Sequence, residues 1–286
     1  MPVVFEKVSY EYSKGTPFSR LALKGISLEI KEGESVCVLG ATGSGKTTFV
    51  LLSNGVLFPT EGYVSVDGLI TTDKQINIKE VRKKVGVVLQ YPEHQFFLPT
   101  AKEEILYAPK NFHSTNSAVL EKSLKDTLEL LEIKEEILDR NPFELSGGEK
   151  RRVAIASVLS YSPKYLVMDE PLVGLDSKAR SQLLDFLKKY REMKKTWIVV
   201  THDVDAFLFT ADRFLVFHEG AVAFDGKRSE FIENALERLE DWGLRPSTKL
   251  RFLKRLTGKD LQTINNDQEL ETILFSSKIV DCESLR

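Results

Sequence analysis

Short apolar runs alternate with longer amphipathic stretches along most of this chain. Four runs are typical of buried strands, because each is short and rich in β-branched or aromatic residues; they cover residues 35–39, 85–89, 165–168 and 197–200. Between the last two, apolar residues recur at helical spacing, which predicts a helix over residues 177–192. A strand, a helix and a strand in that order favour a right-handed crossover and a parallel sheet. The sequence therefore predicts an α/β core.

Two regions depart from this alternation. Residues 1–30 and 60–85 carry alternating patterns and turn signals, as an antiparallel sheet flanking the core would. Residues 101–142 have a mostly helical pattern with one leucine stripe, which predicts a helical insertion. We expect the resulting helical subdomain at about residues 95–160. The stripe consists of Leu120, Leu124, Leu128 and Leu131.

The C-terminal part of the chain has a third pattern. Four apolar residues at helical spacing predict a helix from about residue 229 to Gly243, and Pro246 then interrupts the chain. A second helical run follows at 248–256, and Gly258 precedes a third. We expect a core domain over residues 1–228 and a helical extension over 229–286. The extension serves dimer contact or regulation, or it only covers apolar surface of the core.

Composition narrows the class of protein. With 286 residues, 42% hydrophobic and 29% charged, the chain is long and apolar enough for about two folding units. The formal charge of −2 offers no whole-chain attraction to nucleic acid or to an anionic membrane. Cys37 and Cys282 share no metal-ligand spacing, and neither a signal peptide nor a spanning segment is recognisable. We expect a soluble intracellular chain that reaches a membrane only through partners.

Residues 40–47 read Gly-Ala-Thr-Gly-Ser-Gly-Lys-Thr and match the pattern G-x-x-x-x-G-K-[ST] of a phosphate-binding P-loop in full. The glycines let backbone N–H groups converge on phosphate oxygens, and the following helix adds its partial positive charge. Lys46 can reach the β- and γ-phosphates, and Thr47 can offer its hydroxyl oxygen to Mg²⁺. The bland alternative is a glycine-rich turn that happens to contain Lys-Thr. The candidate nucleotide-binding residues here are Gly40, Thr42, Gly43, Ser44, Gly45, Lys46, Thr47 and Thr48.

A second glycine-containing segment reads Leu145-Ser146-Gly147-Gly148-Glu149 and precedes an apolar helical run. It makes another helix N-terminus with exposed N–H groups, which is an anion site by the same physics. Together with the P-loop before it and Asp169-Glu170 after it, this pentapeptide resembles the signature of ATP-binding-cassette (ABC) ATPases. The resemblance implies a P-loop α/β fold that binds and hydrolyses ATP. It also implies that Ser146, Gly147 and Gly148 face the γ-phosphate held by another protomer.

The segment 165–171 looks like the Walker B strand of this family. Asp169, at the strand end, can hold the Mg²⁺ shell, and Glu170 is placed to accept a proton from an attacking water. In isolation, two adjacent acidic residues are more often solvated loop charges. Their place after the signature makes the catalytic interpretation the stronger one.

Four further positions resemble family features that are individually weak. Gln90, after the strand at 85–89, looks like the glutamine that contacts Mg²⁺ and the lytic water. His202 resembles the histidine that steadies the γ-phosphate, and Asp176 resembles the aspartate that contacts the opposite protomer. Tyr12 resembles the aromatic residue that stacks on adenine, with Tyr10 as a competing choice. Their order and spacing extend the resemblance over residues 3 to about 228.

Residues 91–97 are similar to the corresponding stretch of the energy-coupling factor (ECF) branch, the ATPases of prokaryotic vitamin and metal-ion importers. That resemblance implies ATP and Mg²⁺ as cofactors and a second ATPase protomer, identical or paralogous. It also implies a transmembrane coupling subunit, a substrate-binding membrane subunit and a place at the cytoplasmic face of the membrane, with no nucleic-acid partner. Docking is expected near Phe96, Phe97 and Leu98, unless these residues are ordinary core. Glu149 departs from the family, where Gln is commoner.

Three alternatives remain open. The first is another class of ABC transporter. The second is a soluble ABC ATPase acting on DNA or ribosomes, although the segment between Lys46 and Leu145 lacks sustained heptads and the chain holds one cassette. The third is a nucleotide sensor that does not hydrolyse ATP, against which Glu170 and His202 argue.

Overall fold

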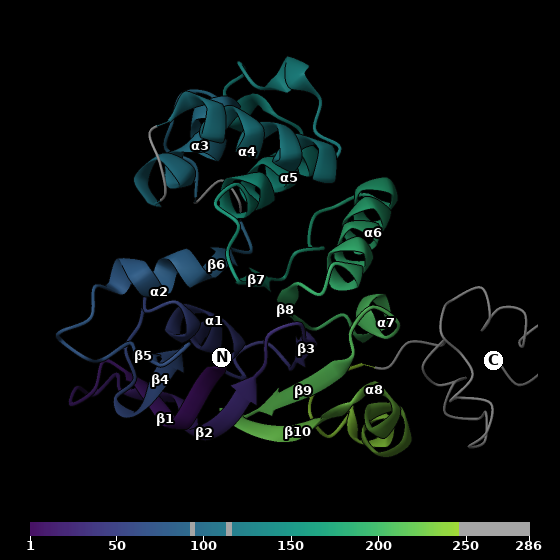
Figure 1. Cartoon of the computed structure of the whole chain (residues 1–286). Helices are drawn as coiled ribbons and strands as arrows, with labels where there is room; N and C mark the ends of the chain where they lie inside the picture. Colours follow the sequence, from purple (N-terminus) through teal and green to yellow (C-terminus); the bar gives the residue numbers. More distant parts are fainter. Residues whose placement is uncertain (92–94, 113–115, 246–286) are drawn as a thin grey trace, which may run out of the picture.

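The computed structural model describes residues 1–91, 95–112 and 116–245, and over these residues it forms two sheets with a helical layer above them (Figure 1). The larger sheet has the strand order β10-β9-β3-β8-β7-β6, and all neighbours except β10 and β9 are parallel. This confirms the predicted α/β core. The strands are β3 (Ser35–Leu39), β6 (Val85–Val88), β7 (Tyr165–Asp169), β8 (Thr196–Thr201), β9 (Arg213–His218) and β10 (Ala221–Lys227).

The smaller sheet is antiparallel with the order β2-β1-β4-β5, as the alternating patterns predicted. Helix α1 (Lys46–Ser53) lies between the two sheets (Figure 1). One expectation was wrong, because part of the region 60–85 is not strand. There α2 (Ile78–Lys84) begins where the side chain of Asn77 accepts a hydrogen bond from the Lys79 amide, an N-cap that ends the extended pattern. The strands are β1 (Val3–Tyr12), β2 (Arg20–Ile30), β4 (Glu61–Val66) and β5 (Leu69–Ile70).

Buried residues form two clusters, one on each face of the larger sheet. Strand β3 shows why: Val36 and Val38 point toward α1 and the antiparallel sheet, whereas Cys37 and Leu39 point toward the helical layer. Because side chains alternate along a strand, an uninterrupted apolar run is buried on both faces. The larger sheet is therefore covered on both faces, and its carboxyl edge is where the strands give way to loops.

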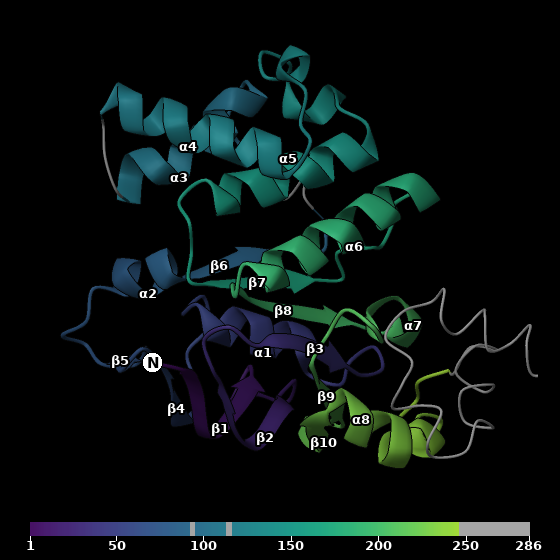
Figure 2. The ribbon, with the colours of Figure 1, turned by 45° about the vertical axis from the view of Figure 1, so that its right-hand side comes forward.

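The helical layer covers one face of the larger sheet (Figure 2). All four leucines of the predicted stripe are buried, each less than 9% exposed. Helix α6 begins at Ser177 and ends at Glu192, as predicted, with Asp176 as its N-cap. None of the described helices is long and apolar enough to cross a membrane. The helices between β6 and β8 are α3 (Ala101–Phe112), α4 (Ser117–Leu130), α5 (Gly147–Leu159) and α6 (Ser177–Glu192), and the short α7 (Val204–Phe207) follows β8.

The hairpin of β9 and β10 was not predicted. Its two-residue turn is Glu219-Gly220, and both residues have positive φ, 48° and 82°. That is the backbone of a type I′ turn, whose twist matches that of the strands it joins. The Gly following a polar residue between two apolar runs was the available signal.

After β10, helical residues continue through α8 (Arg228–Glu230), a π-helical turn (Phe231–Ala235) and a 3₁₀ turn (Leu236–Arg238). The predicted helix therefore ends earlier than Gly243, which has a φ of +71°. Phe231 stacks on Phe214 of β9 with ring centroids 4.4 Å apart. This part of the predicted extension thus packs on the core, and the runs at 248–256 and after Gly258 lie outside the described residues.

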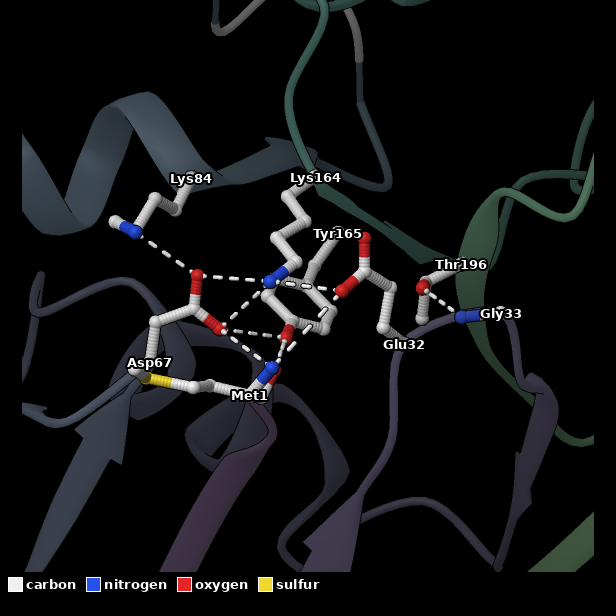
Figure 3. Close-up of polar contacts among 8 residues, drawn as sticks. All are labelled: Met1, Glu32, Gly33, Asp67, Lys84, Lys164, Tyr165 and Thr196. Carbon is white, nitrogen blue, oxygen red and sulfur yellow. Dashed lines mark hydrogen bonds and ion pairs between the residues drawn. The ribbon is translucent and has the colours of Figure 1, made fainter.

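A polar cluster joins the antiparallel sheet to the start of β7 (Figure 3). Asp67, in the turn between β4 and β5, is 6% exposed and accepts from Lys84 at 2.8 Å, Lys164 at 3.0 Å and the Tyr165 hydroxyl at 2.9 Å. Glu32 accepts from Lys164 at 2.9 Å. These contacts, here called the Asp67 cluster, lie at the amino end of the parallel strands.

Candidate nucleotide site

The loop between β3 and α1 can be built only from glycine at several points. A Cβ at Gly45, where φ is +105°, would lie 2.6 Å from the Ala22 carbonyl oxygen. A Cβ at Gly40 would lie 2.5 Å from the Phe217 carbonyl oxygen. Both approaches are closer than any side chain permits, so the sequence forces the backbone to curl between β2 and β9. The amides at the start of α1 therefore open into a cavity.

That cavity has a volume of about 290 Å³ and lies at the carboxyl edge of the parallel strands. Residues from the P-loop, from β1 and from the ends of β6, β7 and β8 line it together. The predicted residues among its lining are Tyr12, Thr42, Gly43, Gly45, Lys46, Thr47, Thr48, Gln90, Asp169, Glu170 and His202. Of the other predicted P-loop residues, Gly40 and Ser44 do not line it.

Two charged side chains, Lys46 and Asp169, line the cavity together with the Thr47 hydroxyl. The Lys46 ammonium donates to the carbonyl oxygens of Gly40 at 2.6 Å and Ala41 at 2.9 Å. The Thr47 hydroxyl donates to Asp169 Oδ2 at 2.9 Å. Burial lowers the pKa of Lys46 and raises the pKa of Asp169, because a low-dielectric site disfavours either charge. Both groups are therefore held in a place that favours added ligands of opposite charge.

Glu170 follows Asp169 and is oriented by the next strand. Its Oε2 accepts from the Thr201 hydroxyl at 2.9 Å, and its Oε1 lies 2.8 Å from His202 Nδ1. When the Glu170 carboxylate is ionised it only accepts, and His202 Nδ1 is then the donor in this contact. The backbone of Glu170 has a φ of +45°, a region that costs a side-chain-bearing residue about 1–2 kcal/mol. Glu170 is 9% exposed and lines the cavity, so its carboxylate is largely shielded from solvent beside the place where a ligand would bind.

Three lining or supporting residues were missed by sequence reasoning. Arg20 and Ala22, both from β2, line the cavity, and Thr201 fixes the Glu170 carboxylate. Arg20 and Ala22 carry no local signal, since only the pairing of β2 with β1 brings them to the cavity. Thr201 directly precedes His202, and that adjacency was a usable signal.

The two candidate aromatic residues take different places. Tyr12 lines the cavity, and its hydroxyl lies 3.1 Å from the Thr48 hydroxyl oxygen. Tyr10 does not line it and packs edge-on against Tyr12 with ring centroids 4.8 Å apart. Burial raises the pKa of Tyr10, which is consistent with a ring that supports Tyr12 from behind.

The signature segment lies elsewhere: Ser146, Gly147, Gly148 and Asp176 do not line the cavity of their own chain. Ser146 caps α5, and Glu149 Oε2 accepts from its amide at 2.8 Å and its hydroxyl at 2.7 Å. These hydrogen bonds lower the pKa of Glu149. Gly148 packs against the start of α6, since a Cβ there would lie 3.4 Å from the Ala179 Cβ. The structure therefore brings the signature and Asp176 segments together, on a surface separate from the cavity.

The residues of the cavity fit a nucleotide and a divalent cation. Thr47 and Asp169 supply adjacent oxygen donors, the ligand type that Mg²⁺ prefers. Lys46 and the P-loop residues Gly43 and Gly45 line the same cavity, so a phosphate there would meet both the ammonium and the loop.

A P-loop at the end of β3, with an acidic pair at the end of β7 two strands away in the same parallel sheet, is typical of a P-loop nucleotide triphosphatase. The ABC transporter family model matches residues 23–173 of this chain. Two solved structures share the fold, each with a TM-score of 0.71 and 32% identity. One is a dimeric ATP-binding cassette bound to ADP and phosphate, covering 79% of this chain and 98% of that one. The other is cbiO1 from Clostridium perfringens, part of an ABC transporter complex, covering 83% and 94%.

The chain belongs to the ABC transporter ATPase family and has ATPase activity of that type. Its curated relatives narrow the class further. It is 38% identical to an energy-coupling factor transporter ATP-binding protein of Clostridium perfringens, over 96% of this chain and 95% of that one. It is 36% identical to the corresponding protein of Clostridium tetani, over 99% and 100%. The ECF branch, rather than another transporter class or a soluble cassette, is therefore the one this chain joins.

Proposed function

We propose that this chain powers an ECF-type importer by closing on ATP as a head-to-tail dimer. One observation carries the proposal: the cavity gathers Lys46, Asp169 and Glu170 but none of the signature residues. The N-terminus of α5 is a second anion site on a different surface. A second copy, or a paralogue, placing its Ser146 over the first protomer's cavity would complete the site.

Within one protomer, each lining residue would have a distinct task. The P-loop amides and Lys46 bind the β- and γ-phosphates, and Tyr12 stacks on the base. Thr47, Asp169 and Gln90 would hold Mg²⁺, which neutralises phosphate charge when it is bound. Glu170 accepts a proton from water, and His202, oriented by Glu170, steadies the γ-phosphate. Asp176 contacts the opposite protomer, so chemistry and dimer opening are linked.

A groove beside the core supports the proposal that a membrane subunit docks on this chain. It has a volume of about 230 Å³ and lies between α3, α5 and β6, with Gln95, Phe97 and Tyr107 in its lining. The Phe97 side chain is 61% exposed and meets Tyr107 edge-on at 4.8 Å, whereas Phe96 is 7% exposed and belongs to the core. Exposed aromatic residues at a groove are typical docking anchors. We place the transmembrane coupling subunit here, at the cytoplasmic face of a prokaryotic membrane, with the substrate-binding subunit selecting the cargo.

The domain division also remains part of the proposal. Residues 1–228 form the ATPase, and the extension from 229 onward serves dimer contact or regulation. The stacking of Phe231 on Phe214 supports a firm attachment of the extension to β9. A nucleic-acid partner is not part of the scheme.

Glu170→Gln tests the scheme. We expect ATP binding to persist, turnover to fall at least about 100-fold, and an ATP-bound dimer to accumulate, because only proton acceptance is lost. Calorimetry, phosphate release and size-exclusion chromatography with ATP measure the three. Glu219→Gln is the matched control, since it removes the same charge from an exposed residue that also has positive φ. Wild-type turnover in Glu170→Gln would remove Glu170 from the reaction, and a monomer at all ATP concentrations would contradict the closed dimer.

A further inference from the structure

One buried cation in the signature helix is not used by the scheme above. Arg151 lies on α5, one turn after the signature glycines, and is 4% exposed. Its guanidinium donates to the carbonyl oxygens of Leu89 at 3.0 Å and Gln90 at 2.7 Å. It also donates to the carbonyl oxygen of Val173 at 3.3 Å. A single side chain thus binds three main-chain acceptors in two separate loops.

These two loops carry the residues to which the reaction is assigned. Leu89 and Gln90 follow β6, so the Gln90 carbonyl is bound by Arg151 while the Gln90 side chain lines the cavity. Val173 lies between Glu170 and Asp176. Arg151 itself does not line the nucleotide cavity. Its position therefore allows it to act on the site only through the backbone that it holds.

The backbone of Leu89 is held at both its amide and its carbonyl group. Gln95 Oε1 accepts from the Leu89 amide at 3.3 Å, and Gln95 Nε2 donates to the Val87 carbonyl at 3.2 Å. Arg151 binds the carbonyl oxygen of the same residue. The planar guanidinium, with donors in a rigid fork, suits several carbonyls at once in a way that a lysine ammonium does not. Leu89 and Gln90, here called the Gln90 loop, are thereby hydrogen-bonded to α5 through Arg151.

We propose that Arg151 is a positioning residue that sets Gln90 against the signature helix, so that α5 and Gln90 move as one body. The inference rests on the proposed function, since it assigns Gln90 to the Mg²⁺ and water side of the cavity. When α5 moves toward a facing protomer, the fork carries the Gln90 backbone with it. Gln90 already lines the cavity in the single protomer, so a shift of α5 would change its position relative to the nucleotide and link closure to chemistry.

The neighbouring arginine provides a matched control. Arg152 also lies on α5, but it donates to Gln182 Oε1 on α6 at 2.9 Å rather than to Leu89 or Gln90. Arg152→Gln removes the same charge from the same helix. It therefore reports what loss of an α5 cation does when the Gln90 loop stays fastened.

The experiment is a double-mutant cycle on the full chain, comparing wild type, Arg151→Gln, Gln90→Ala and the double variant by steady-state ATP hydrolysis. We expect Arg151→Gln to lower kcat roughly tenfold, because misplacement of a reacting group by about 1 Å costs that much or more. We expect KM for ATP to stay within about twofold, since the P-loop is untouched. In the Gln90→Ala background, Arg151→Gln should lower kcat by less than about twofold.

Each other result overturns the idea. An equal fold-loss in both backgrounds means that Arg151 acts through something other than Gln90. A rise in KM as large as the fall in kcat means a merely structural role for Arg151. An equal fall in kcat in Arg152→Gln means the same. Should Arg151→Gln fail to fold, Arg151→Lys keeps the buried charge without the fork and is read by the same cycle. If Gln90→Ala alone hydrolyses ATP like wild type, the assignment of Gln90 fails with the inference; if only the cycle is additive, the inference fails by itself.

Discussion

Strand β7 joins two clusters of buried charge that behave in opposite ways. It begins at Tyr165 in the Asp67 cluster and ends at Asp169 in the nucleotide cavity. In the Asp67 cluster, one carboxylate meets two ammonium groups and a phenol within 3.0 Å. In the cavity, Lys46 reaches carbonyl oxygens instead, and Asp169 accepts from a hydroxyl. In the Asp67 cluster, lysine ammonium groups therefore pair directly with a carboxylate. In the cavity, the Lys46 ammonium and the Asp169 carboxylate make no such pair among the described residues and are available to a ligand.

The pKa shifts express this difference. Burial works to raise the pKa of Asp67, but the hydrogen bonds from Lys84, Lys164 and Tyr165 hold it below its usual value. Burial works to lower the pKa of Lys164, but its bonds to Glu32 and Asp67 hold it above its usual value. For Asp169 and Lys46, burial is the larger effect, so that the pKa of Asp169 is raised and the pKa of Lys46 is lowered. Charges that pair with each other stabilise a fold, whereas charges kept apart are available to a ligand.

Lys46→Ala and Lys164→Ala should give the largest contrast. We expect Lys46→Ala to weaken ATP binding about 100-fold, because the charge-assisted bonds to the phosphates are lost. Lys164→Ala should leave ATP affinity unchanged, since Lys164 lies at the amino end of the strands. Isothermal titration calorimetry with ATP measures both. Equal ATP affinities in the two variants would mean that the two clusters do not differ in function.

Asp67→Asn and Asp169→Asn should separate the clusters by stability. We expect Asp67→Asn to reduce the free energy of unfolding by about 2–4 kcal/mol, because two ammonium groups lose their buried partner. Asp169→Asn should change it by less than about 1 kcal/mol, or raise it, since that carboxylate is already disfavoured by burial. Denaturant unfolding monitored by circular dichroism provides the comparison. A larger loss for Asp169→Asn would reverse our interpretation of the two sites.

The pH dependence of stability should show the smallest effect, with opposite signs at the two carboxylates. The pKa of Asp67 is depressed in the folded chain, so its stabilisation is present above the usual value of 3.8 and is lost as pH falls through the folded-state pKa. The pKa of Asp169 is raised, so its penalty disappears as pH falls through that higher value. On acidification, wild type should approach Asp67→Asn in stability and gain on Asp169→Asn. Unfolding midpoints measured from pH 7 down to about pH 2, below the usual value of 3.8, test this, and parallel curves for all three proteins would refute it.

Much of the fold could be predicted because its signals are local. The strand at 35–39, the helix at 177–192 and the P-loop glycines each depend on neighbours in sequence. The failures have local causes too: the Asn77 cap that begins α2 and the Glu219-Gly220 turn were both legible and were missed.

The sequence alone determined the family, the P-loop and the acidic pair at the end of β7, because each is a short run of residues whose spacing the chemistry dictates. Only the tertiary structure decided that Arg20 lines the cavity, that Arg151 holds the Gln90 loop and that Ser146 does not line the cavity of its own chain. These relations connect residues tens of positions apart. They depend on how strands pair and helices pack, which sum many weak contacts that no local pattern records.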